Sequence, residues 1–93
     1  MDNIILIDNT QAGRFELQKD GVTAAFADYT LQPGLLTFTH TESLPQFAGQ
    51  GLASQLATFA LGEVRRRGLK AASECSFFTG YINKHAQYQD LLA

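Results

Sequence analysis

The chain has 93 residues, of which 45% are apolar and 17% are charged, and its formal net charge is -2. This length has room for one small domain, residues 1–93, and the weakly acidic charge excludes a general nucleic-acid binder. The single cysteine, Cys75, excludes an internal disulfide, and no apolar run is long enough to span a membrane, so we expect a soluble, cytoplasmic protein.

Extended segments are predicted throughout the first half of the chain. Asp20-Gly21 separates two alternating segments, which is a strong hairpin signal. Pro33-Gly34 predicts a second tight turn, and the segment after it is rich in β-branched and aromatic side chains. We therefore expect a three-strand antiparallel meander, preceded by one short apolar strand. The predicted strands are residues 4–7, 14–18, 22–29 and 35–42.

The hydrophobic period changes after Pro45. Apolar residues recur at three- and four-residue intervals, which predicts an amphipathic helix, and Gly68 after three arginines predicts its end. A strand follows and should run parallel to the third meander strand through a right-handed crossover. The predicted elements are a helix over 52–64, a strand over 70–74, a helix over 77–85 and a helical turn over 88–92. The expected fold class is α+β, with a mixed, mainly antiparallel sheet covered by helices.

Two glycines, Gly49 and Gly51, stand where an extended stretch gives way to the predicted helix. The N-terminus of a helix has N–H groups without partners and about half a positive charge, so a phosphate fits there. Glycines remove side chains from the path of such an anion. The alternative is that they only let the chain turn after Pro45. The glycines alone leave both interpretations open.

The segment QFAGQG, residues 46–51, resembles the coenzyme A signature Q/R-x-x-G-x-G/A of the GNAT N-acetyltransferase superfamily. More narrowly, residues 14–92 are similar to the short, single-domain GNAT-like family, which lacks the superfamily's usual N-terminal helices. The most specific elements are "HTE", "GQGLA", the lone Cys75 and the tail "YI-x-x-H-x-x-Y-x-DL". Ser76, Ala86 and Gln87 depart from that family's pattern and bear on where the local helices start.

The resemblance implies that the chain binds acetyl-CoA. The pyrophosphate is expected on backbone N–H groups of the loop, and the pantetheine beside the strand that ends at Leu44, in a gap between two parallel strands. A peripheral role in holding the CoA phosphates is open for Lys84 or an arginine. Phe77, Tyr81 and Tyr88 line the acyl pocket in one interpretation and belong to the core in the other. The implied cofactor-binding residues are Leu44, Gln46, Ala48, Gly49, Gln50, Gly51, Leu52 and Ala53.

An acetyltransferase must also take a proton from the incoming amine. Strand alternation places Phe38, His40 and Glu42 on one face, together with Leu44. The resemblance implies that Glu42 is the general base, directly or through a water, with His40 as the second candidate. The alternative is that Thr39, Thr41 and Glu42 form a solvated strand end and that His40 is a satisfied, partly buried histidine.

Cys75 precedes the last main helix, and two catalytic roles are open for it: an acyl-accepting nucleophile or a proton donor to the departing CoA thiolate. The alternative is a small buried apolar residue. The preferred interpretation of the whole chain is an enzyme that transfers acetyl from acetyl-CoA to a primary amine of an unidentified acceptor. A non-catalytic CoA-binding or sensing module is the first alternative, and a ligand-free protein-interaction domain is the second. No metal, nucleic-acid or membrane partner is expected.

Overall fold

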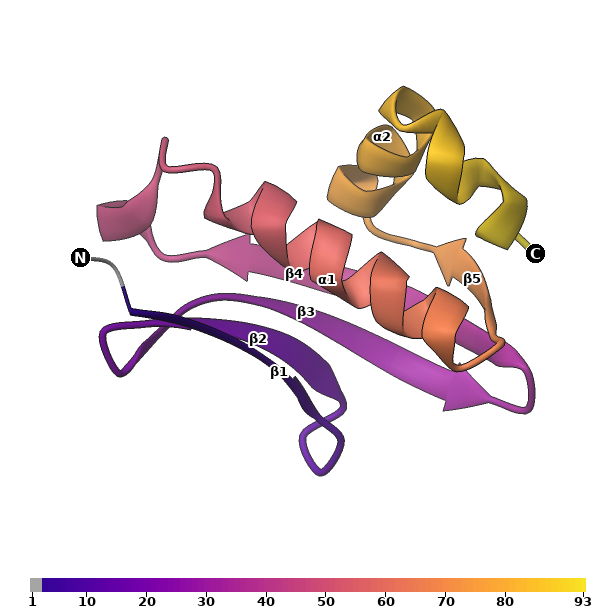
Figure 1. The fold of residues 1–93 in the computed structure, drawn as a ribbon, viewed down its shortest axis with the longest axis horizontal. Helices are drawn as coiled ribbons and strands as arrows, with labels where there is room; N and C mark the ends of the chain where they lie inside the picture. Colours follow the sequence, from indigo (N-terminus) through magenta and orange to yellow (C-terminus); the bar gives the residue numbers. More distant parts are fainter. Residues whose placement is uncertain (1–2) are drawn as a thin grey trace.

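The computed structural model describes residues 3–93, which form a five-stranded sheet, two α-helices and two short 3-10 helices (Figure 1). The strands pair in chain order, β1 to β4 antiparallel and β5 parallel to β4. The α+β class and the crossover from β4 to β5 are confirmed. No helix within residues 3–93 is both long enough and apolar enough to cross a membrane. The elements are β1 Ile4–Asn9, β2 Arg14–Lys19, β3 Val22–Gln32, β4 Leu35–Ser43, η1 Pro45–Phe47, α1 Leu52–Arg66, β5 Lys70–Ser73, α2 Ser76–Lys84 and η2 Ala86–Leu91.

Tight turns join the antiparallel strands where the sequence predicts them. Asp20 and Gly21 both have a positive φ, 53° and 82°, as a type I′ hairpin turn requires. Gly34 has a φ of 74° in the turn between β3 and β4. Two differences from the predictions concern strand length and number. β1 pairs with β2 along all of its residues and so belongs to the meander, and β3 continues to Gln32 because its last residues pair with β4.

Both α-helices pack on one face of the sheet, which we call the covered face. Phe15 of β2 meets Phe59 of α1 edge-on at 6.0 Å, and Phe38 of β4 stacks on Phe78 of α2 at 3.8 Å. Since Phe15 and Phe38 are 6.2 Å apart, the two helices share one core. Full burial of a phenylalanine stabilises the fold by about 1.5–3 kcal/mol. No helix of the described residues covers the opposite face, which we call the open face (Figure 1).

The C-terminal end of α1 is tied to the first strand. Arg67 donates to one carboxylate oxygen of Asp8 at 3.0 Å, and the Tyr29 hydroxyl donates to the other at 2.6 Å. Burial and the hydrogen bond to Asp8 raise the pKa of Tyr29 to about 12, so the hydroxyl keeps its proton at neutral pH. Gly68, with a φ of 68°, then ends the helix as predicted. These contacts hold α1 against the sheet.

A β-bulge in β4 changes which side chains face the helices. The register with β3 skips one residue of β4, so Thr39 lies between Phe38 and His40 without a partner. Phe38 is fully buried on the covered face, whereas His40 and Glu42 lie on the open face. The prediction that Phe38 shares a face with His40 and Glu42 is therefore wrong. Simple alternation fails because the extra residue reverses the facing of the residues after it.

Candidate active site

The parallel strands β4 and β5 separate toward their C-terminal ends. They pair over 35–38 and 70–73, and the last backbone bond runs from the N–H of Glu74 to the carbonyl of Phe38 at 2.8 Å. β4 continues to Ser43, and β3 is its only strand neighbour there among the described residues. An unpaired strand edge offers N–H and C=O groups to an extended ligand. The two strands thus open a gap beside the second half of β4.

The loop between η1 and α1 presents bare backbone at the N-terminus of the longer helix. Gly49 and Gly51 have φ values of 81° and 73°, and an added Cβ at either would meet nothing within 4 Å. The first helical bond joins the N–H of Gln55 to the carbonyl of Gly51, so the N–H groups before it have no helical acceptor. No side chain caps this end, and the first turn has no acidic residue. The positive end of the helix dipole is therefore accessible to an anion.

A cation from β2 contacts this loop. The ammonium group of Lys19 donates to the side-chain oxygen of Gln50 and lies 5.8 Å from the centre of the Phe47 ring. Gln50 stands between the two glycines, so the contact ties the loop to the sheet. The sequence gives no sign of it, because Lys19 and Gln50 are 31 residues apart.

His40 and Glu42 are the polar groups of the open face beside the gap. Nε2 of His40 is 3.2 Å from Oε2 of Glu42, and the two side chains are 57% and 58% exposed. The Phe26 ring lies next to His40 at 6.2 Å, with the Arg14 guanidinium 4.6 Å above it. Burial raises the pKa of Glu16, but hydrogen bonds led by the one from Arg14 outweigh it and hold this pKa below its usual value. Glu16 is thus a paired anion, and Glu42 is the solvent-accessible carboxylate.

Cys75 lies at the gap as the residue that precedes α2. It is 9% exposed, and its Sγ donates to Oγ1 of Thr41 at 3.3 Å, across the separated strands. Thr41 directly precedes Glu42, whose side chain points to the other face. The structure therefore brings Cys75 and Glu42 to the same stretch of β4 from opposite faces of the sheet.

The predicted cofactor-binding residues follow one path from the end of β4 through η1 to α1. Most of them are exposed or half-buried. Leu52 is only 4% exposed, and its side chain belongs to the hydrophobic core. The N–H of Leu44 donates to the carbonyl of Ala24 at 2.8 Å, which removes this donor from any ligand.

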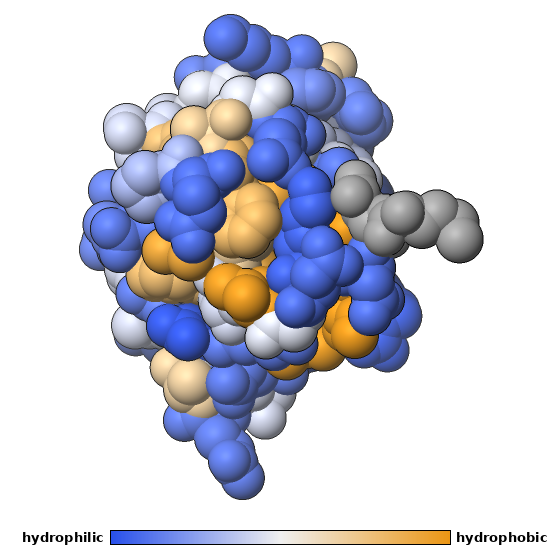
Figure 2. Space-filling view, turned by 90° about the vertical axis from the view of Figure 1, so that its left-hand side faces the viewer, coloured by the Kyte–Doolittle hydropathy of each residue, from blue (hydrophilic) through white to orange (hydrophobic). Residues whose placement is uncertain are grey.

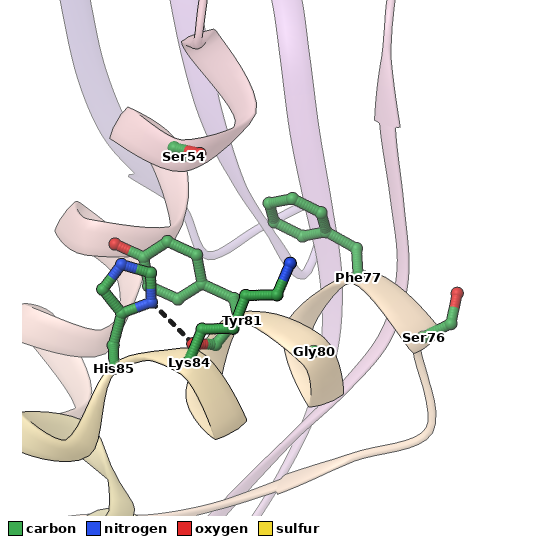
Figure 3. A pocket seen from close by; sticks show the side chains of 7 residues that line it. All are labelled: Ser54, Ser76, Phe77, Gly80, Tyr81, Lys84 and His85. Atoms are coloured by element: carbon green, nitrogen blue, oxygen red, sulfur yellow. Dashed lines mark hydrogen bonds between the residues drawn. The ribbon is translucent and has the colours of Figure 1, made fainter.

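A pocket of about 340 Å³ opens between the first turn of α1 and α2 (Figure 3). Sequence reasoning left Phe77 and Tyr81 as either acyl-pocket or core residues, and both line this pocket while also packing against the core. Tyr88 is not one of the lining residues and instead packs against the core. The residues that line it are Ser54, Ser76, Phe77, Gly80, Tyr81, Lys84 and His85.

Sequence reasoning missed Ser54, Ser76, Gly80 and His85. A signal for the α2 members was present, since residues 76, 80 and 84 and residues 77, 81 and 85 form two adjacent rows at four-residue spacing. The first row is polar or small and the second is aromatic. Two such rows side by side are typical of a helix face that is only half covered by the rest of the protein. The sequence does not indicate that Ser54 of α1 faces these rows, because that depends on tertiary packing.

The end of the molecule that carries the glycine loop is mostly hydrophilic. Figure 2 shows apolar groups near the middle of this end, separated by hydrophilic ones. In this view the apolar groups are scattered and do not form one broad patch.

Comparison with known proteins identifies the family of the chain and supports its fold. The sequence profile of the GCN5-related N-acetyl-transferase family matches residues 14–91. The chain belongs to this family. No curated protein matches the chain at a significant level.

Two solved structures share the fold of this GCN5-related chain. The first is a GCN5-like protein from Staphylococcus aureus, proposed to be an N-acetyltransferase, with a TM-score of 0.77 and 22% identity over 100% of this chain and 91% of the other. The second is the ribosomal-protein-S18-alanine N-acetyltransferase from Escherichia coli, with a TM-score of 0.62 and 19% identity. That match covers 75% of this chain and 63% of the other. At these identities the likeness concerns the fold, which is a GNAT fold.

Proposed function

We propose that this GCN5-related chain binds acetyl-CoA and transfers the acetyl group to a primary amine of a small-molecule or protein acceptor. The observation that carries the proposal is the exposed backbone of Gly49 and Gly51 at the N-terminus of α1, beside the gap between β4 and β5. A diphosphate suits the loop and an extended pantetheine arm suits the open strand edge. The two features together match the two parts of CoA.

In this proposal the backbone of residues 48–53 surrounds the pyrophosphate, and Gln46 and Leu44 flank the pantetheine. Glycine at positions 49 and 51 leaves the loop backbone open to direct contact. The acetyl end of the ligand then lies in the gap near Thr41 and Cys75. Backbone N–H groups of β4 that face this gap stabilise the negative charge that develops on the carbonyl oxygen.

Glu42 acts as the general base, because it is the exposed carboxylate on the β4 side of the gap. It takes a proton from the ammonium form of the acceptor, directly or through a water, so that the neutral amine can attack. His40, at 3.2 Å, holds the carboxylate in place and is the second candidate for the base. The acceptor approaches from the open face, since no helix of the described residues covers Glu42 there.

Ligand-dependent stability and turnover together test this function. With acetyl-CoA or CoA at a hundred times its Kd, the free energy of unfolding is expected to rise by about 2.7 kcal/mol, and ATP should have a smaller effect. Polyamines, amino acids and lysine peptides are then screened for release of the CoA thiol. Stabilisation without turnover supports the non-catalytic CoA-binding module. No stabilisation by either CoA species contradicts both acetyl transfer and the CoA-binding module. The protein-interaction domain is then the remaining interpretation.

Cys75→Ala is expected to lower turnover by about tenfold or more, because either open role places its thiol at the reacting group. Thermal stabilisation by acetyl-CoA should persist in this variant. An acetyl adduct in the intact mass of the unaltered protein, absent in Cys75→Ala, assigns the nucleophilic role, and its absence favours the proton donor. Full activity of Cys75→Ala removes this residue from the mechanism and leaves it as a buried apolar group.

A further inference from the structure

A buried carboxylate, that of Glu16, lies on the open face, although no helix of the described residues covers that face. Glu16 is only 4% exposed. Three side chains of β1 and β2 donate to it: Nδ2 of Asn9 at 3.1 Å, Nε of Arg14 at 2.7 Å and Nε2 of Gln18 at 3.4 Å. A buried charge is stable only where such partners satisfy it. The shortest of these contacts fixes the position of the Arg14 guanidinium.

The Arg14 guanidinium is also held by an aromatic ring. Its Cζ lies 4.6 Å from the centre of the Phe26 ring. Because Nε donates to Glu16, the two outer nitrogens Nη1 and Nη2 are left over, and within residues 3–93 no oxygen accepts a hydrogen bond from them. The side chain is 32% exposed. A guanidinium that is fixed on two sides and has free outer donors is preorganised to bind a carboxylate.

These donors lie close to the proposed general base. Phe26 is directly opposite Glu42 in the register of β3 and β4, and its ring lies 6.2 Å from that of His40. Arg14 and the pair of His40 and Glu42 therefore lie on either side of one ring. Neighbouring strands are about 4.8 Å apart, so β2 and β4 are about 10 Å apart, and Arg14 shortens this span by reaching over the ring of β3. The arrangement suits a ligand whose two charged groups are a few ångström apart.

The open face presents charges of both signs to such a ligand. Asp28 is opposite Arg14 in the register, and among the described residues no ion pair joins the two side chains. Glu42 adds a second carboxylate on this face. A diamine would bring its second ammonium group against the fixed guanidinium, whereas a zwitterion satisfies both signs.

We propose that the acetyl acceptor is a free amino acid, whose carboxylate binds Nη1 and Nη2 of Arg14 and whose amine lies at Glu42. Arg14 is then the residue that determines specificity, and Glu16 positions it. The products are an N-acetylamino acid and CoA. This inference rests on the proposed function and names the class of its acceptor.

Matched acceptors test the inference, because alanine and ethylamine differ by one carboxylate, as do lysine and cadaverine. Release of the CoA thiol gives kcat/KM, which in the unaltered protein is expected to be about tenfold higher for the amino acid of each pair. Arg14→Gln should lower this ratio by about tenfold, mainly by raising KM for the amino acid. Comparing the ratio between variants cancels any difference in intrinsic reactivity within a pair.

Two further variants serve as controls for Arg14→Gln. Arg14→Lys keeps a positive charge and a donor for Glu16 but lacks the planar fork, so it should lose most of the preference. Arg66→Gln removes an exposed arginine of α1 that pairs with Glu63, and it should leave the ratio unchanged. Thermal stabilisation by acetyl-CoA shows that each variant is folded. If Arg14→Gln does not fold, Arg14→Lys alone decides the outcome.

The possible outcomes separate this inference from the proposed function. A ratio that is the same in the unaltered protein and in the folded Arg14 variants overturns the inference. Faster acetylation of ethylamine and cadaverine than of the two amino acids also overturns it, and assigns the open face to a purely cationic acceptor. Acetylation of lysine peptides but not of amino acids overturns it while the proposed function stands. If no amine is acetylated, the catalytic part of the proposed function fails, and the inference fails with it.

Discussion

Gly51→Asp is expected to abolish the stabilisation of the protein by acetyl-CoA, whereas Gly51→Asn keeps most of it. Gly51 has a φ of 73°, and Asn and Asp are the L-residues that best tolerate this region, so both variants carry a similar strain. They have nearly the same size and differ in charge. A carboxylate at the N-cap also favours the helix dipole by about 0.3–1 kcal/mol, so the ligand-free Asp variant should unfold no earlier than the Asn variant.

Thermal unfolding with and without acetyl-CoA measures the effect. At a hundred times the Kd of the unaltered protein, the expected gain is about 2.7 kcal/mol for that protein and close to zero for Gly51→Asp. A preserved gain in the Asp variant places the pyrophosphate away from this loop. Loss of the gain in both variants shows instead that any side chain at position 51 blocks the ligand.

Glu42→Gln is expected to lower the rate of acetyl transfer by about a hundredfold, since the amide cannot accept the proton of the amine. Binding of acetyl-CoA should not change, because the side chain lies on the open face, away from the glycine loop. Release of the CoA thiol with the best acceptor gives the rate, and thermal stabilisation by acetyl-CoA gives the binding. Glu74→Gln is the matched control, as it removes one exposed carboxylate at the end of β5.

His40→Gln separates the two candidates for the base. If Glu42 is the base, loss of its 3.2 Å neighbour should cost much less than loss of the carboxylate itself. If His40→Gln lowers turnover more than Glu42→Gln does, His40 is the general base and Glu42 is the residue that holds it in place. Unchanged turnover in Glu42→Gln removes this residue from the mechanism.

The elements of this fold that could be predicted from the sequence are those decided by neighbouring residues. Asp20-Gly21 specifies its hairpin because both residues accept a positive φ. The three-to-four spacing of apolar residues specifies α1, and a strand on either side of one helix specifies a parallel crossover. The glycine loop was recognisable for the same reason, since its signature is contiguous.

The parts of the candidate site that could not be predicted depend on contacts between distant segments. The bulge at Thr39 arises from the register between β3 and β4, and the composition of β4 gives no sign of it. The contact of Lys19 with Gln50 needs β2 and the loop to meet. The pocket wall likewise depends on the hydrogen bond between Thr58 and Tyr81, which joins two helices.

The bulge at Thr39 changes which face of the sheet the later residues of β4 occupy. A strand has two alternating rows of side chains, and a bulge leaves one residue unpaired, so the residues after it lie on the face opposite to the one that simple alternation gives. If Thr39 were paired as in a regular strand, Glu42 would face the helices and the hydroxyl of Thr41 would leave Cys75 for the open face. The faces on which Glu42 and Thr41 lie are therefore decided by the pairing of the strand as much as by the identity of its residues. A relative that keeps "HTE" in a strand of the same length but without the bulge would present a different face to its substrate.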